Sequence, residues 1–178
     1  MSKTLDPQTR LTVNPAAEGD PRLERTSLAT VVTSDVPIVS ERSMYWGGDA
    51  SPFGEGHNSS GMVTTATRWG LADGRVGGPE GFVTYILLAN PFPESAQVTV
   101  TFLREGGAAP IVKTYTVLGA SRFNIDVGSS VPELRDESFG ARIDVTNGLP
   151  IAIERSIYWN ANGIFWAGGT NALGTPLP

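Results

Sequence analysis

Residues Pro150–Trp159 read PIAIERSIYW, and residues Pro37–Trp46 read PIVSERSMYW. The offset between the two stretches is 113 residues, and at this offset Thr33–Gly61 aligns without a gap on Thr146–Gly174. Similarity at a fixed period is typical of chains built from repeated units. We therefore expect a duplicated scaffold, whose shared residues hold the fold instead of forming a unique active site.

The repeat divides the chain into three parts. We assign residues 1–8 to a tail, residues 9–61 to the C-terminal half of a preceding β repeat, and residues 62–178 to a complete β repeat with a Pro-rich end. Upstream of the main match, after one single-residue gap, Arg10–Asn14 aligns with Arg122–Asp126. The first ten residues lack the apolar core of a signal peptide. We expect the chain to be a piece of a longer protein.

The composition favours short strands and excludes several functions. Gly and Pro contribute 21 and 13 residues, which implies many turns between short apolar runs. The net charge is −5 and the basic residues are scattered, so we expect no nucleic-acid partner. Without cysteine, the chain has no disulfide, thiolate nucleophile or Cys-based zinc site. No apolar run is long enough for membrane insertion.

Alternation of apolar and polar residues predicts the strands of the complete repeat. Residues 82–90 are apolar on both faces, as expected of a central strand. The other predicted strands span residues 96–103, 112–118, 123–127, 139–145 and 151–159. Asn147-Gly148 predicts a hairpin turn, and residues 131–137 could form one helical turn. About seven short strands predict an all-β, immunoglobulin-like antiparallel sandwich.

The repeated Glu-Arg-Ser-x-Tyr-Trp strand supplies the candidate site. Alternation places an arginine on a largely apolar face, where burying an unpaired guanidinium would be very costly. One interpretation is a carbohydrate-binding groove, in which Trp stacks on a sugar while Arg and Glu bind its hydroxyls. The other, which we favour, is a structural network in which the arginine pins a loop and the Trp covers the core. The candidate residues are Glu41, Arg42, Trp46, Glu154, Arg155 and Trp159.

Other polar motifs predict no chemistry. The Gly-rich segments 47–48, 54–58 and 167–171 are expected to be turns, because no helix or lysine follows them to complete a phosphate site. His57 is the single histidine, and we expect a solvated loop residue instead of a catalytic base. Carboxylates such as Asp49 and Asp73 lie near turns without calcium-loop spacing. We predict no enzyme activity, cofactor or bound metal, although interdomain calcium stays open.

The order of the motifs resembles tandem β-sandwich repeats in large secreted or cell-surface proteins of bacteria. The resemblance covers nearly all of residues 9–174. It implies a non-catalytic extracellular module for structure, spacing or adhesion, whose partners are neighbouring repeats or domains and, in the alternative, glycans. The residues that carry it are Glu41–Trp46, Trp69–Gly74, Ile86–Pro91, Val98–Phe102, Tyr115–Val117 and Ser121–Ile125.

Overall fold

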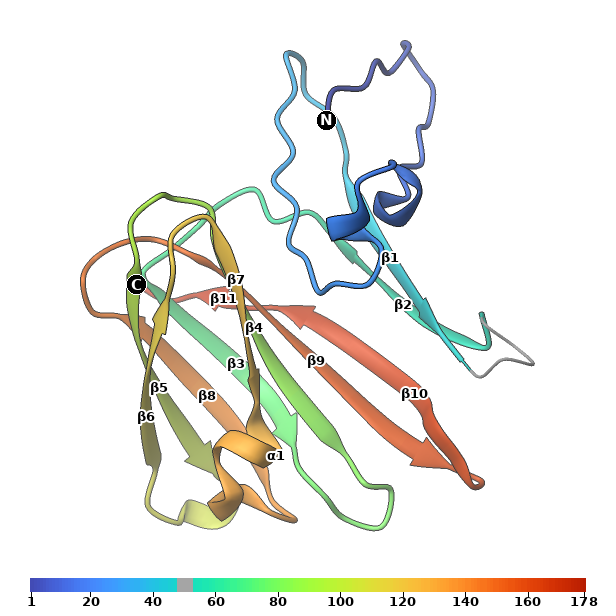
Figure 1. Cartoon of the computed structure of the whole chain (residues 1–178). Coiled ribbons are helices and arrows are strands. Elements are labelled where there is room, and N and C mark those ends of the chain that lie inside the picture. Colours follow the sequence, from blue (N-terminus) through green and yellow to red (C-terminus); the bar gives the residue numbers. More distant parts are fainter. Residues whose placement is uncertain (48–52) are drawn as a thin grey trace. The chain divides into compact units, whose positions relative to one another are not determined.

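The computed structural model describes residues 1–47 and 53–178, which form a nearly all-β protein (Figure 1). Gly48 and Asp49, named above in a loop and among the carboxylates, lie outside the described residues. The strands are β1 (Glu41–Trp46), β2 (Glu55–Ser60), β3 (Arg68–Arg75), β4 (Val83–Asn90), β5 (Ala96–Arg104), β6 (Ile111–Val117), β7 (Ser121–Asp126), β8 (Ser138–Val145), β9 (Ala152–Ala161), β10 (Ile164–Leu173) and β11 (Thr175–Pro176). The helical elements are α1 (Val127–Ser130) and the 3-10 turns η1 (Pro15–Ala17), η2 (Pro21–Leu23), η3 (Glu105–Gly107) and η4 (Pro132–Leu134).

The chain forms two compact units, residues 1–30 and residues 31–178. The first unit holds η1 and η2, each with Pro at its start and an Asn or Asp cap. Residues 10–14, which align with part of β7 in sequence, contain no strand. The second unit contains all the described strands. Among the described residues, no helix has the length and apolar character needed to span a membrane.

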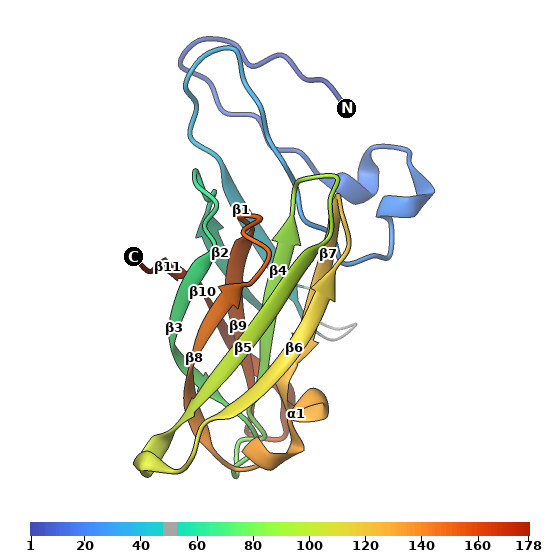
Figure 2. The same ribbon diagram turned by 90° about the vertical axis from the view of Figure 1, so that its left-hand side faces the viewer.

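Two antiparallel sheets form the body of the second unit (Figures 1 and 2). One has the strand order β10-β9-β4-β7, and the other has the order β11-β3-β8-β5-β6. The predicted all-β sandwich is confirmed, with β4 as an internal strand. The finer, immunoglobulin-like description stays a prediction.

The core lies between the inward faces of these sheets, as the alternation predicts. Val98, Val100 and Phe102 of β5 are buried, and so is the alternating set from Phe139 to Val145 on β8. The fully buried Thr84 is satisfied because its hydroxyl donates to the carbonyl of Arg75 and accepts from the same residue's N–H. The burial of alternate side chains fixes the register of β5 and β8, because a slip by one residue would expose the buried set.

Two turn predictions need correction. Asn147-Gly148 is a turn with a positive φ of 75° at the glycine, but it links β8 to β9 in different sheets, so it closes no hairpin. Its asparagine instead accepts from the N–H of Gln97 and donates to the carbonyl of Ser95. The Gly-rich segments 54–58 and 167–171 belong largely to β2 and β10 and are strands, not loops. A helical turn is present within 131–137, as η4.

The two copies of the repeated sequence form the same local structure. In the hairpin β1–β2, Glu41 lies opposite Ser60 and Trp46 lies opposite Glu55. In the hairpin β9–β10, the pairs at the same offset of 113 residues are Glu154–Leu173 and Trp159–Gly168. Their surroundings differ, because β9 pairs with β4 in the sandwich whereas β1 and β2 form a separate two-stranded sheet.

Candidate functional site

The candidate residues that lie on β9 are divided between its two faces. Arg155 and Ile157 are on the face that is turned toward the interior of the sandwich, as are the core residues Ile151 and Ile153. The opposite face carries Glu154, Ser156 and Tyr158, and side chains of the β1–β2 hairpin contact it. We call this contact the hairpin interface. It consists of Arg42, Trp46 and His57 from the first hairpin and Glu154, Tyr158, Trp166, Gly169 and Asn171 from the second.

An ion pair joins one copy of the repeat to the other at the hairpin interface. The guanidinium of Arg42 donates to both carboxylate oxygens of Glu154, at 2.5 and 3.3 Å. The amide of Asn171 also donates to Glu154, at 3.0 Å. Arg122 on β7 is coupled to the same charges, and burial, followed by repulsion from Arg42, lowers its pKa. Glu154 is therefore ion-paired with Arg42, and its charge partly offsets the lowering of the Arg122 pKa.

An aromatic cluster forms the other half of the hairpin interface. Trp46 donates its indole N–H to the carbonyl of Trp166 at 2.7 Å, and its ring meets Tyr158 edge-on with centroids 5.2 Å apart. Tyr158 stacks on Trp166 at 4.4 Å. A Cβ at Gly169 would lie 2.7 Å from the Tyr158 ring and 2.8 Å from the Trp46 ring. Glycine is thus required there because two rings occupy the space of a side chain.

His57 lies in β2 and is half-buried, so the prediction of a solvated loop histidine is wrong. Its Nε2 is 3.3 Å from the hydroxyl of Tyr158, and its ring centroid is 5.3 Å from that of Trp46. The buried Nδ1 has no hydrogen-bond partner among the described residues. Burial lowers the pKa of His57, with a smaller contribution from Arg42.

Arg155 and Trp159 lie apart from the hairpin interface. The side chain of Arg155 is 9% exposed and reaches Asp73 at 3.2 Å. Burial lowers the pKa of Arg155, and Asp73 opposes that shift. Asp73 belongs to a bulged part of β3, where the register with β8 shifts between Leu71 and Gly74, and bulges re-aim side chains in this way. The bulge explains how the exposed carboxylate of Asp73 reaches the buried guanidinium of Arg155.

Trp159 rests on Gly168, where a Cβ would come within 2.5 Å of its indole ring. It also contacts Phe82, with ring centroids 5.9 Å apart. Glu41 is exposed on the outward face of β1. The structure therefore brings Arg42, Trp46 and Glu154 together and leaves the other three candidates in separate places.

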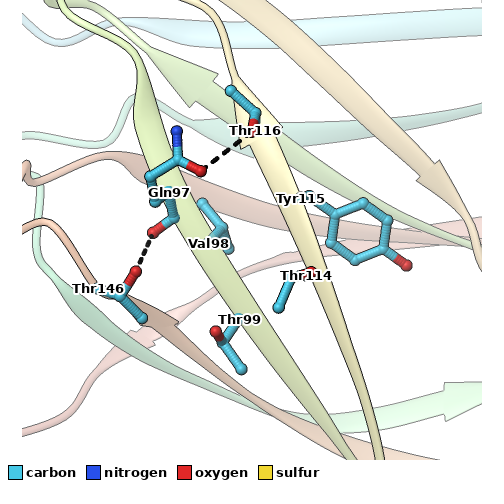
Figure 3. A pocket seen from close by; sticks show the side chains of 7 residues that line it. All are labelled: Gln97, Val98, Thr99, Thr114, Tyr115, Thr116 and Thr146. Carbon is cyan, nitrogen blue, oxygen red and sulfur yellow. Dashed lines mark hydrogen bonds between the residues drawn. The ribbon is translucent and has the colours of Figure 1, made fainter.

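The hollows on this unit are shallow. One depression of about 170 Å³ lies over the outward face of β5 and β6 (Figure 3). Its volume is smaller than the roughly 300 Å³ of the smallest typical ligand pockets. The hydroxyls of Thr116 and Thr146 already donate hydrogen bonds to Gln97. An open hollow of about 430 Å³ lies beside Arg75, Asp136 and Glu137. Within the described residues, no group of three or more acidic or histidine side chains is placed to hold a metal.

Sequence reasoning missed Tyr158, Trp166, Gly169 and Asn171. The sequence held one usable signal, because the second hairpin repeats the Tyr and Gly of the first at positions that face each other. In the first hairpin, a Cβ at Gly56 would come within 2.8 Å of the Tyr45 ring. The repeated glycines therefore seat repeated tyrosines, which is a structural role.

The fold and these contacts define an all-β sandwich with the β1–β2 hairpin docked on it. No protein-family model matches the sequence, and no curated protein sequence matches it either. A crystal structure of Thermotoga maritima 1070 is similar in fold, with a TM-score of 0.56 and 13% identity, over 65% of this chain and 97% of the other. The Anabaena sensory rhodopsin transducer aligns over 53% of this chain and 99% of its own, with 20% identity and a TM-score of 0.43.

Proposed function

We propose that this chain is a non-catalytic structural or adhesion module of a larger secreted or cell-surface bacterial protein. The observation that carries the proposal is the use of the repeated residues. Arg42 and Trp46 hold one hairpin to the other, Arg155 is buried beside Asp73, and Trp159 packs on Phe82. Residues that are kept in two copies and used for packing serve a scaffold. In this proposal, residues 9–61 are the C-terminal half of a preceding repeat.

The first and last strands of the sandwich, β3 and β11, lie side by side, which favours a module that presents a surface over a spacer that links domains end to end. The backbone N–H of Leu177 donates to the carbonyl of Arg68 at 3.0 Å, and β11 pairs with β3. A longer chain would therefore enter and leave the sandwich at one point. Tension on such an antiparallel pair separates its hydrogen bonds one after another instead of loading them together. The module is accordingly better suited to presenting a surface than to transmitting force.

Localisation tests this proposal. Antibodies raised against the chain should label intact cells of the producing bacterium, and protease added outside the cells should remove the signal. The control is an antibody against a cytosolic protein, whose signal the protease must leave intact. Labelling that requires lysis of the cells would contradict a surface role.

Carbohydrate binding is the alternative, and two tryptophans keep it testable. Trp69 is 1% exposed, and Trp166 is stacked between Tyr158 and Phe165. Trp46 and Trp159 are half-buried, so the exposed parts of their rings are the candidate sugar platforms. Stacking of a sugar there would quench indole fluorescence.

A glycan array combined with fluorescence titration decides this alternative. A glycan that quenches the wild-type protein but not Trp46→Phe or Trp159→Phe would replace the structural proposal with a binding function. If no glycan on the array changes the fluorescence, the alternative fails and the structural proposal stands.

A further inference from the structure

We propose that the position of His57 makes the hairpin interface pH-sensitive, so that the β1–β2 hairpin is held at neutral pH and released as His57 gains a proton. This inference concerns the interface itself and does not depend on the role of the module in a larger protein.

The attachment of the β1–β2 hairpin depends on side chains. β1 and β2 pair with each other and form a sheet separate from the two sandwich sheets. An isolated two-stranded hairpin is only marginally stable in water. Its main tethers are the Arg42–Glu154 pair and the Trp46 indole hydrogen bond. A change in one interface side chain can therefore shift the docking equilibrium.

The geometry around His57 accommodates a neutral imidazole. A neutral ring has one N–H donor and one acceptor nitrogen, whereas an imidazolium has two donors. Nε2 can either donate a hydrogen bond to the Tyr158 hydroxyl or accept one from it. Nδ1 is buried and has no partner among the described residues. A second proton would thus place a charged donor at a site without an acceptor, which is costly.

The charges facing His57 partly cancel. Arg42, its neighbour on β1, opposes protonation, while Glu154 on β9 and, to a smaller extent, the backbone of His57 itself favour it. Glu154 is already engaged by Arg42 and by Asn171 of β10, and the second arginine coupled to it, Arg122, comes from β7. Tyr158 on β9, whose hydroxyl contacts His57, is neutral at physiological pH, and burial raises its pKa. Tyr85 on β4 packs against Tyr158, and burial raises its pKa as well.

The sign of the effect follows from linkage. Because burial at the hairpin interface lowers the pKa of His57 from its ordinary value of 6.5, the docked hairpin favours the neutral ring. The stabilisation is complete well above pH 6.5 and is lost as the pH falls from there through the docked pKa. Over that window the undocking constant rises by up to about tenfold per pH unit.

Nuclear magnetic resonance tests the inference on the intact chain, because His57 is the single histidine. The ring resonances of His57 give its pKa directly. The Trp46 indole N–H, assigned by its loss in Trp46→Phe, reports docking through its hydrogen bond to Trp166. The matched control is His57→Thr, since Thr170 occupies the equivalent position opposite Ile157 in the second hairpin. His57→Gln provides a second non-titrating variant.

We expect the His57 ring to titrate below pH 6.5, and the Trp46 indole signal to change with the same midpoint. Both non-titrating variants should lose that transition. A His57 pKa at or above 6.5 would overturn the inference. So would an indole transition that is unchanged in both variants, because the acid effect would then belong to another group, such as Glu154.

Discussion

Separating the Arg42–Glu154 pair should weaken the hairpin interface asymmetrically. Arg42→Gln leaves Glu154 with the hydrogen bond from Asn171 and with the favourable charge of Arg122. Glu154→Gln instead leaves the Arg42 guanidinium without its anion and removes the negative charge that favours the charged form of the half-buried Arg122. We therefore expect the Glu154 substitution to cost more docking free energy than the Arg42 substitution.

The size of the coupling follows from exposure. Two unit charges about 4 Å apart attract by roughly 4 kcal/mol at an effective dielectric constant of 20 and by about 1 kcal/mol in water. The Arg42 side chain is 40% exposed and that of Glu154 is 17% exposed, so solvent screens a large part of the attraction. We expect a coupling energy of about 1 kcal/mol, the upper end for partly exposed pairs. This corresponds to about a fivefold change in the opening equilibrium.

Hydrogen exchange of the β1 and β2 amides measures this local opening in the wild type, both single variants and the double variant. The control cycle uses Lys113 and Glu133, a pair 3.1 Å apart whose side chains are 33% and 51% exposed. That pair should couple by only a few tenths of a kcal/mol. Equal couplings in the two cycles, or an Arg42 substitution that costs more than the Glu154 substitution, would refute the reasoning.

Three further predictions concern packing and pH. Gly169→Ala pushes a methyl group into two aromatic rings and should cost about 1–3 kcal/mol in urea unfolding; an unchanged midpoint would mean that the rings move freely. Thr84→Val removes the partner of both backbone groups of Arg75 and should cost about 1–3 kcal/mol, which calorimetry would detect as a lower Tm. The pKa of Glu137 is lowered by its hydrogen bonds from Arg104, so this pair stabilises the fold above pH 4.5 and the benefit disappears as acid protonates the carboxylate. Glu137→Gln should flatten the dependence of stability on pH in that acid range, and a profile as steep as that of the wild type would count against the pair.

Much of the sandwich follows from side-chain alternation. The strand predicted over residues 96–103 is β5, Ala96–Arg104, and the one predicted over 139–145 is β8, Ser138–Val145. Both have one buried and one exposed face, so a period of two is visible in the sequence. β3 was recognised only as a motif, because Gly70 and Gly74 and the bulge at Asp73 interrupt its alternation.

The hairpin interface was less predictable. Alternation showed correctly that Arg42 and Trp46 share a face of β1, and desolvation implied that each arginine needs a partner. The sequence contains no information on which carboxylate that is, because the contact with Glu154 depends on where the first hairpin docks. The prediction of turns at the glycines of β2 and β10 is wrong, because the sequence does not distinguish a glycine that makes room for an aromatic ring from one that adopts a positive φ.

The most direct test of the account is a nuclear Overhauser measurement between the Trp46 ring and the backbone of Gly169. The duplicated hairpins, docked through repeated residues, place that ring within van der Waals reach of Gly169. We predict strong cross-peaks from the Trp46 ring protons to the Gly169 Hα protons at neutral pH. If these cross-peaks are absent while those between paired strands β9 and β10 are present, the docked arrangement is contradicted.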